Sequence, residues 1–531
     1  MFEDFGNTPS VLILGAGLMQ EPAIMAAKKH GFKAVVVDGN PNAVGVGLAD
    51  SFAPIDLKDK EGLLSFAKTI PNLQGVFTAG TDFSASVAYV ANNLHLHSHD
   101  YEACLNASNK VRMRSCFEKS NVASPCFESV KAEDISKFTD EKLSKMSFPK
   151  VIKPTDNMGA RGCRMIRRKS EFLPAVKDAV ENSRSGTAIL EDYMNGKEFS
   201  IDSIVYKGTL TITGFADRHI YYPPYFIETG HSMPTQIDWK QRREIIETFA
   251  KGVKALGLTE GAAKGDIKYT EKGAMIGEIA ARLSGGYMSG WTYPYAADVN
   301  LTEQALLIAT GKEPNELLQK RVRLEVNEDC PFEIYDLPCA KASVERAWIS
   351  IPGVIKEIIG LDDVKKIEGI KDVLPRNKVC DKVDFPRNNV QKCGNVISVA
   401  HTFEEAQKIA HKAIRGITLR LEPKNADTDA FLRGETREDE EGFPPYAFPS
   451  LKDFKAKKAF IAENKSVMDY CPEELLSSKE EDWNHSSVKQ TLERFDSLCP
   501  KHKELDAEKF FNALIRGGIQ GCLYVADSAN I

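Results

Sequence analysis

The sequence predicts an α/β protein with a parallel sheet at its N-terminus, and two observations lead to this fold class. Short apolar runs at residues 11–14, 34–37 and 75–78 alternate with helical segments, a pattern typical of βαβ units and a parallel sheet. Further on, residues 264–286 alternate polar and apolar side chains around a Glu-Lys-Gly turn, which predicts a β-hairpin. An α+β region therefore follows the parallel sheet.

Composition and charge narrow the class of protein. A chain of 531 residues with 42% hydrophobic and 27% charged residues is typical of a globular protein of roughly three or four domains. The net charge of -6 argues against nucleic acid or an anionic membrane as a partner. No apolar run has transmembrane length, the acidic start lacks a secretory signal, and the 11 cysteines contain no C-x-x-C pair. We therefore expect a cytoplasmic protein with reduced thiols.

The first apolar run leads into glycines that begin a dinucleotide-binding fingerprint. Gly15 and Gly17 have the required spacing, and Asp38 lies about where a ribose-binding acid is expected. The third glycine position, however, is occupied by Gln20. Because the fingerprint is incomplete, we favour glycines that let the backbone approach a small substrate over an NAD site.

Basic residues and a glycine-containing loop suggest a phosphate site. Residues 106–120 predict a helix that carries Lys110, and a strand that contains Lys153 opens into the loop at 155–163, TDNMGARGC. Small residues with free backbone N–H groups can surround phosphate oxygens, and Lys153 and Arg161 add positive charge. The loop is not a Walker motif, and an ordinary hairpin loop is the alternative.

Two further segments place polar side chains beside strands. An apolar strand at 188–190 ends in Glu191, and a second strand follows at 198–205. Acids at this position can accept hydrogen bonds from an amino group or from sugar hydroxyls, although solvated acids at a turn are commoner. Residues 217–236 contain the pair Pro223-Pro224 and several tyrosines, and they predict a long loop that is either a substrate lid or a packed surface loop.

The hairpin at residues 264–286 predicts a pair of facing carboxylates. A three-residue turn that ends in a left-handed Gly273 pairs Thr270 with Ala274. Asp266 then lies directly opposite Glu278 on the same face. Two facing carboxylates need a compensating cation, and clustered oxygen ligands suit Mg²⁺. The alternative is an exposed hairpin with two unrelated acids.

These segments, in this order, resemble the ATP-grasp superfamily, and within it the carboxylate–amine ligases of the L-amino acid (dipeptide) ligase type. The motifs that carry the resemblance are VIKP with its glycine loop, ILEDYMNGKEFSID and GDIKYTEKGAMIGEIAARLSGG. It extends from about residue 11 to 310. It continues more weakly over 322–421, where SVERAWISIPGVIKEIIG and CGNVISVAHTFEEAQKIAHKAI are similar to the closing domain of these ligases.

The resemblance implies a division of the chain into four parts. A Rossmann-like domain that precedes the ATP-grasp domain is expected at residues 1–105. The ATP-grasp domain is expected at 106–318, with a mobile lid subdomain at about 122–192. An α+β domain follows at 319–425, and a linker and helical extension of unknown role occupies 426–531.

The resemblance also implies roles for individual residues. The residues expected to contact ATP hold or cover its phosphates, lie along the edge of the adenine, or bind the ribose. They are Lys110, Lys153, Gly159, Arg161, Gly162, Glu191, Tyr193, Met194 and Glu198. Mg²⁺, with Mn²⁺ as an alternative ion, is expected at Asp266 and Glu278. Arg282 and Lys153 are expected to be catalytic. Candidates for substrate contacts are Tyr222, Tyr225, Glu228 and His231.

Two positions depart from the family pattern. The family commonly has Glu where Asp266 stands, and it has Asn where Ala280 stands. Asp is shorter by one methylene, and Ala280 cannot bind a metal ion. A second Mg²⁺ would therefore have fewer protein ligands.

The implied reaction is the ATP-dependent joining of a small carboxylate to an amine through an acyl phosphate, with release of ADP and phosphate. The alternatives are a carboxylating enzyme that uses bicarbonate through carboxyphosphate, and a nucleotide-binding regulatory protein with an inactive site. The expected partners are small carboxylate and amine substrates, and a homodimer is the candidate assembly.

Overall fold

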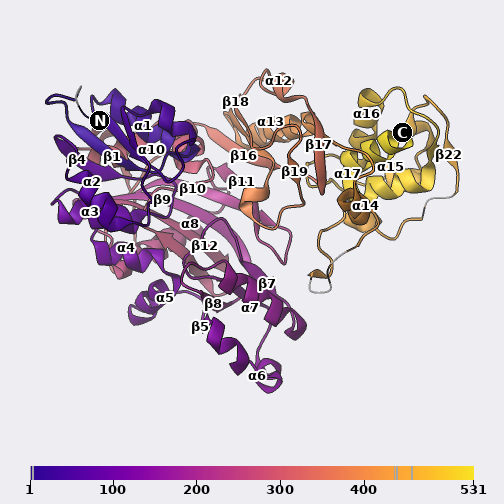
Figure 1. Ribbon diagram of the computed structural model, residues 1–531. Helices are drawn as coiled ribbons and strands as arrows, with labels where there is room; N and C mark the ends of the chain where they lie inside the picture. Colours follow the sequence, from indigo (N-terminus) through magenta and orange to yellow (C-terminus); the bar gives the residue numbers. More distant parts are fainter. Residues whose placement is uncertain (1, 3–4, 436, 438–439, 456–457, 531) are drawn as a thin grey trace.

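The computed structural model describes residues 2, 5–435, 437, 440–455 and 458–530. Figure 1 shows an elongated molecule, with the N-terminal domain at one end and the C-terminal helices at the other. A small separate sheet with its helices projects from the lower side of the central region (Figure 1).

The N-terminal domain is built on a four-stranded parallel sheet with the strand order β3-β2-β1-β4. The side chains of β1 are all buried, as expected for a parallel strand that is covered on both faces. The three strands predicted from apolar runs are present, so the α/β fold class is confirmed. The elements of this domain are β1 Ser10–Leu14, α1 Glu21–Lys29, β2 Lys33–Val37, β3 Ser51–Ala53, α2 Lys60–Ala67, β4 Leu73–Phe77 and α3 Ser84–Asn93.

The projecting sheet is antiparallel, with the strand order β5-β8-β6-β7. Its core forms where the apolar face of helix α7, which includes Phe172 and Val176, packs on Val130 and Ile152 of the strands. The elements are β5 Phe127–Lys131, α6 Asp140–Lys145, β6 Lys150–Pro154, β7 Arg164–Ile166, α7 Phe172–Glu181 and β8 Thr187–Asp192. This unit, called the lid below, coincides with the predicted lid subdomain at about 122–192.

A ten-stranded sheet forms the centre of the molecule. Its main path has the order β13-β12-β9-β10-β11-β16-β20-β18, and β14 and β15 lie beside β10. Helices α4, α5 and α8 cover the β12–β13 end. The elements up to residue 336 are α4 Tyr101–Ser108, α5 Lys110–Lys119, β9 Gly196–Tyr206, β10 Thr209–Tyr221, β11 Ile227–Met233, α8 Trp239–Leu256, β12 Gly261–Thr270, β13 Gly273–Ala280, α9 Tyr293–Ala297, α10 Leu301–Ala309, α11 Asn315–Lys320, β14 Val322–Arg323 and β15 Glu333–Asp336.

The hairpin of β12 and β13 has the predicted carboxylate pair, although its turn differs from the prediction. Thr270 pairs with Gly273, so the turn contains two residues rather than three. A β-bulge beside Asp266 then adds one residue to the partner strand, and Asp266 pairs with Glu278. The extra residue is Gly277, where a Cβ atom would come within 3.0 Å of the Asp266 carbonyl oxygen. The bulge therefore compensates for the shorter turn.

The prediction of a long loop at residues 217–236 is wrong. β10 continues to Tyr221 and β11 begins at Ile227, so a short connection joins two long antiparallel strands. The side chains of β11 are buried throughout, because β11 lies in the middle of the sheet between β10 and β16. Its Glu, His and Ser side chains conceal the apolar alternation by which a strand is usually recognised.

The central sheet crosses the predicted domain limit at residue 319, since β11 pairs with β16. Helix α13 packs on β16 and β20, and Thr402 caps this helix in a capping box with Glu405. The elements of this region are β16 Ala342–Trp348, β17 Gly353–Ile359, α12 Leu361–Val364, β18 Ile370–Pro375, β19 Lys382–Val383, β20 Gly394–Ala400, α13 Phe403–Gly416 and β21 Thr418–Leu421.

The C-terminal extension shares one hydrophobic core with this region. Phe431, Phe495 and Phe510 of the extension belong to the same cluster as Ile355 and Ile414. The extension contains α14 Ala426–Leu432, β22 Phe460–Ile461, α15 Glu473–Leu476, α16 Val488–Leu498, β23 Leu505–Asp506 and α17 Ala507–Ala529. The extension is therefore helical, and α17 is its longest helix.

The linker that was expected within residues 426–531 needs a correction. Residues 436, 438 and 439 lie outside the described residues. In the part that follows, Phe443 and Phe448 are fully buried, and Glu440 forms an ion pair with Arg387. The described part of this segment is thus packed against the domain, because its aromatic side chains enter the shared core.

None of the helices in the part of the chain that the structure describes is long and apolar enough to cross a membrane.

Candidate active site

A cavity of about 480 Å³ lies between the lid and the central sheet. The N-terminal domain contributes Met19 and Gly80 to its wall, and the C-terminal region contributes Arg376 and Lys392. Most of the residues predicted to contact ATP, metal or substrate line this cavity: Lys110, Lys153, Gly159, Arg161, Glu191, Tyr193, Met194, Glu198, Glu228, Asp266, Glu278 and Arg282. The structure therefore brings together side chains that are up to 172 residues apart in the sequence, Lys110 and Arg282 being the outermost.

Two lysines supply positive charge from different elements. Lys110 is the first residue of α5, which Asn109 caps, and its Nζ donates to the Asn157 carbonyl oxygen at 3.1 Å. Lys153 lies near the end of strand β6, just before the glycine loop, and its Nζ lies 2.7 Å from Glu191. Both ammonium groups are nearly buried, so they interact strongly with any anion in the cavity.

Glu191 orients Lys153 rather than facing solvent. Its buried carboxylate lies between Lys153 and Arg114, whose Nε donates to it at 2.8 Å. Burial alone would raise the pKa of Glu191, but the positive charges of Arg114 and Lys153 lower it below its ordinary value. Arg114 also donates to the Gly277 carbonyl oxygen at 2.6 Å. It therefore joins the lid strand to the hairpin bulge, a role that the sequence did not indicate.

The facing carboxylates have the properties of metal ligands. Among the described residues, the ion-pair partner of Glu278 is Lys110, with 3.7 Å between the charged atoms, and no hydrogen bond reaches its carboxylate. Burial alone would raise the pKa of Glu278, but Lys110, Lys153, Lys264 and Arg282 together lower it to about 2. Glu278 is therefore ionised at neutral pH and free to bind a cation.

Asp266 also has capacity for a cation. Its buried Oδ1 lies 2.8 Å from Arg218 without hydrogen-bond geometry, and its other oxygen contacts the Lys264 ammonium. Hard anionic oxygens from two strands of one ribbon fit a Mg²⁺ ion. Lys264 pairs across the hairpin with Ala280, so a lysine stands where a second ion would need ligands. The residues present fit one ion better than two.

Arg218 is the principal site residue that sequence analysis missed. Its guanidinium contacts three carboxylates, at Glu198 (2.6 Å), Asp266 (2.8 Å) and Glu228. Burial alone would lower the pKa of Arg218, but these three anions raise it well above its ordinary value. Arg218 lies on β10 in the stretch that was predicted to be a loop. Asp217, Arg218 and His219 are consecutive polar residues, so no alternation marks the strand at this point.

Arg282 is oriented by the N-terminal domain. Its Nε and Nη2 atoms donate to Asp82 at 3.1 and 2.9 Å, and its Nη1 donates to the carbonyl oxygen of Leu283. Asp82 follows strand β4, at the carboxyl end of the parallel sheet, where ligands of α/β domains commonly bind. The guanidinium is thus fixed at the cavity wall by two domains.

The predicted phosphate loop adopts a strongly turned backbone. Gly159, Ala160 and Gly162 have positive φ angles of 70°, 59° and 65°. The carbonyl oxygen of Gly159 accepts from Asn389 N–H at 3.0 Å, and a second bond from Met165 N–H to Pro224 joins the lid to the central region. The loop is therefore held against the C-terminal region on one side of the cavity.

Gly162 does not line the cavity, in contrast to the prediction. A Cβ atom at this position would come within 2.7 Å of Asn182 Cβ. This glycine therefore permits close packing of the loop on the segment that follows α7, rather than contact with a phosphate.

Among the predicted substrate contacts, Glu228 lines the cavity and His231 lies directly behind it. His231 is fully buried, with its ring nitrogens 3.4 Å from Glu228 and 2.8 Å from Glu345. Burial alone would lower the pKa of His231, but the two carboxylates raise it above its ordinary value. His231 therefore supports Glu228 from beneath.

Tyr222 and Tyr225 lie outside the cavity, which corrects their assignment as substrate contacts. The ring of Tyr222 packs on Phe385 with 5.4 Å between centroids. The hydroxyl of Tyr225 donates to Glu440 at 2.5 Å. Both side chains pack in the shared C-terminal core, because the connection between β10 and β11 lies against that core.

The incomplete glycine fingerprint of the N-terminal domain has a structural explanation. The Gln20 amide exchanges two hydrogen bonds with the Ala79 backbone, at 2.6 and 2.9 Å. Asp38 accepts from Ala16 N–H at 2.8 Å. Both side chains therefore hold the loops at the carboxyl edge of the parallel sheet in place.

Comparison with protein families identifies two segments of the chain. A family described as an ATP-grasp domain matches residues 146–290. A second family, described as L-amino acid ligase C-terminal domain 2, matches residues 347–422. The first matched segment contains the lid from β6 onward and the carboxylate hairpin, and the second contains β18 and β20 of the central sheet.

Individual relatives are more distant. Mouse carnosine synthase 1 is 22% identical over 335 residues, which cover 57% of this chain and 40% of the relative. The crystal structure of an L-amino acid ligase from Bacillus licheniformis has a TM-score of 0.65 at 18% identity and covers 78% of this chain and 99% of its own. The biotin carboxylase domain of 2-oxoglutarate carboxylase from Hydrogenobacter thermophilus, solved with MgADP, ADP and bicarbonate, has a TM-score of 0.58 at 16% identity over 82% of this chain and 96% of its own.

Proposed function

Because the chain matches the ATP-grasp domain and the L-amino acid ligase C-terminal domain 2, we propose that it is a ligase that activates a small carboxylate with ATP and joins it to an amine. The products are an amide, ADP and phosphate. The observation that carries this proposal is the cavity itself, in which two lysines, an arginine and a pair of facing carboxylates converge. A site of this composition is suited to stabilising charge on transferring phosphoryl oxygens.

ATP is the first substrate in this proposal. Lys110 and Lys153 contact its phosphates, and the loop that contains Gly159 and Arg161 covers them. Tyr193 and Met194 lie along the edge of the adenine, and Glu198 accepts hydrogen bonds from the ribose hydroxyls. Support comes from the position of all these residues around one cavity.

Asp266 and Glu278 would hold one Mg²⁺ ion, which supplies positive charge beside the phosphates. MgADP is bound in the related biotin carboxylase structure. Lys264 already neutralises part of the Asp266 charge, so we propose a single ion in this site. Mn²⁺ prefers similar oxygen ligands and is the expected substitute.

The first chemical step is attack of the substrate carboxylate on the γ-phosphorus of ATP. The bond between that phosphorus and the β,γ-bridging oxygen breaks, and ADP leaves. Lys153 and Arg282 neutralise the oxygens of the transferring group, each from a position fixed by a carboxylate (Glu191 and Asp82). Because these positions are set before the reaction, little reorganisation is needed in the transition state.

In the second step an amine attacks the acyl phosphate carbonyl, and phosphate leaves. Glu228 lines the cavity beside Arg218 and is placed to accept a hydrogen bond from the neutral amine, whose proton leaves with the phosphate as the amide forms. The lid shields the acyl phosphate from water, since it closes the cavity through the loop at Gly159. L-amino acids are the amine class that the family relationship favours.

The proposal is tested by measuring phosphate release from ATP and Mg²⁺ in a panel of paired amino acids and other small acids. ADP formation that needs an amino acid and persists without bicarbonate supports the ligase. Lys153→Ala should lower the rate of release by about 10²–10³, while Lys177→Ala, which removes an exposed lysine from lid helix α7, should leave it unchanged.

A carboxylating enzyme is the second candidate, because the related biotin carboxylase was solved with bicarbonate. ADP formation that requires bicarbonate and no amino acid would establish it instead. A regulatory protein with an inactive site would release no phosphate while still binding ATP.

A further inference from the structure

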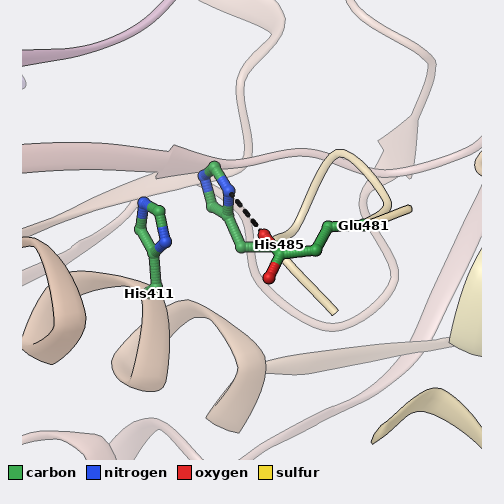
Figure 2. A group of neighbouring side chains, drawn as sticks. All are labelled: His411, Glu481 and His485. Carbon is green, nitrogen blue, oxygen red and sulfur yellow. Dashed lines mark ion pairs between the residues drawn. The ribbon is translucent and has the colours of Figure 1, made fainter. Parts of the chain in front are cut away.

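A second group of metal-ligating side chains, none of which lines the cavity, lies where the C-terminal extension meets the domain before it. Figure 2 shows His411 on helix α13 and, opposite it, Glu481 and His485 on the loop between α15 and α16. One ligand atom from each side chain lies within 4.8 Å of the other two. None of the three side chains has a role in the proposed reaction.

The loop holds its two side chains on one side. The backbone of Glu481 forms an isolated β-bridge with Ser487. The Asp482 carboxylate accepts from the N–H groups of Asn484 and Ser486, at 2.8 and 3.0 Å. These bonds form a tight turn in which Glu481 and His485 project together, as Figure 2 shows.

The same loop is fixed to helix α13. The guanidinium of Arg415 donates to the His485 carbonyl oxygen at 3.0 Å. Arg415 lies one helical turn after His411, so this bond sets the distance between the helix and the loop. The spacing of the three side chains is therefore determined by backbone contacts and not by their mutual attraction.

The ligand atoms are available. His411 Nε2 is buried and has no hydrogen-bond partner among the described residues, an expensive situation for a polar atom. A ring nitrogen without a partner is free to bind a metal ion, which neutral imidazole does.

The arrangement of the two imidazole rings determines how a metal ion would bind. The two imidazole rings are stacked, with centroids 3.7 Å apart and an interplanar angle of 6°. Lone pairs of parallel rings cannot converge, so binding must turn the rings and bring the ligand atoms to the separation of about 3.3 Å that tetrahedral zinc requires. The Glu481 carboxylate, 3.9 Å from His485 Nδ1, offsets the positive charge of the nearby Arg415.

We propose that His411, Glu481 and His485 bind one first-row divalent cation of the Zn²⁺ class and that this ion fastens the C-terminal extension to helix α13. Two neutral imidazoles and one carboxylate are a donor set that suits zinc. Water completes the coordination, since the Glu481 side chain is exposed to solvent. The ion is structural, because it joins two segments that are 70 residues apart, from His411 to Glu481.

The test is isothermal titration calorimetry of the full-length chain with ZnCl₂, combined with zinc K-edge absorption spectroscopy. The wild type should bind one equivalent of zinc in a nitrogen and oxygen environment. His411→Gln and His485→Asn should each weaken this binding at least about tenfold. Asn is chosen at position 485 because His485 has a φ of 62°, which Asn tolerates.

The controls separate ligand loss from misfolding and from thiol binding. Glu481→Gln changes an exposed side chain that cannot disrupt the core, and it should also weaken binding. His401→Gln removes an exposed histidine just before α13 and should bind zinc like the wild type. Zinc should raise the unfolding temperature of the wild type and of His401→Gln but not of His411→Gln. Equal affinity in the wild type and in all three ligand variants, or sulfur around the bound zinc, would overturn the proposal.

Discussion

Replacement of Glu278 by Gln is the most direct probe of the proposed metal site. The change keeps the size of the side chain and removes one negative charge from the hairpin. Asp266, opposite it, already shares its charge with Arg218 and Lys264. Glu278→Gln therefore removes the carboxylate that is free to bind an ion. Mg²⁺ loses a ligand, and the surrounding cations lose a partner.

The magnitude follows from the pKa of Glu278. That pKa falls from 4.5 to about 2, and each unit corresponds to about 1.4 kcal/mol, so the folded state favours the ionised form by about 3 kcal/mol. Because the side chain is 30% exposed, solvent screening reduces the expected effect to about 2 kcal/mol. The folded pKa is the lower one, so this stability is fully present above about pH 4.5 and is lost as the pH falls toward 2.

The assay has two parts. Urea unfolding, monitored by tryptophan fluorescence, should show Glu278→Gln less stable than the wild type at pH 7, with a difference that shrinks as the pH falls below about 4.5. Phosphate release in a Mg²⁺ titration should need at least about tenfold more Mg²⁺ for half of the maximal rate. Glu271→Gln is the matched control, because Glu271 is an exposed acid at the turn of the same hairpin.

The reasoning would be refuted if Glu278→Gln matched Glu271→Gln in both measurements. An unchanged Mg²⁺ dependence would mean that Glu278 does not bind the ion. An unchanged stability at pH 7 would mean that the surrounding cations do not interact with its charge.

Three further predictions concern the other charged groups. Lys153→Ala should lower kcat by about 10²–10³ in the phosphate-release assay, with an unchanged circular dichroism spectrum because Glu191 keeps its second cation. Arg218→Ala should destabilise the protein by about 3–5 kcal/mol in urea unfolding, since it leaves buried carboxylates unpaired; an undiminished midpoint would contradict the shared ion pair. Asp82→Asn should lower kcat about tenfold, because Arg282 loses the carboxylate that orients it. The ATP dissociation constant, measured by calorimetry, should change little. A changed affinity with normal kcat would assign Arg282 to ground-state binding.

The carboxylate pair of the hairpin could be predicted from the sequence, but its turn could not. The pairing of Asp266 with Glu278 was predicted correctly, but from a three-residue turn that the structure does not have. The turn is one residue shorter, and the bulge at Gly277 restores the register. A bulge depends on the partner strand and on packing, so a single sequence indicates it only through an isolated glycine within a strand.

Arg218 was missed for a different physical reason. Strands in the middle of a sheet are usually recognised by apolar side chains, whereas β10 and β11 bury charged groups that pair with one another. Burial of such groups is favourable only when their partners are present, and the partners come from distant parts of the chain. The packed segment around Phe443 was taken for a linker for the same reason, since its core is formed by tertiary contacts.

Two backbone hydrogen bonds hold the lid closed, one from Asn389 to Gly159 and one from Met165 to Pro224. They contribute to the free energy that is needed to open the cavity. A backbone hydrogen bond is worth about 1 kcal/mol net in water. Breaking both costs about 2 kcal/mol, and the ion pair between Arg168 and Glu441 also joins the lid to the C-terminal segment. Nucleotide would enter through the minor population in which these contacts are open, so the rate of loading, and not only the affinity for ATP, would depend on them. Side-chain substitutions in the lid could then alter turnover without touching either substrate.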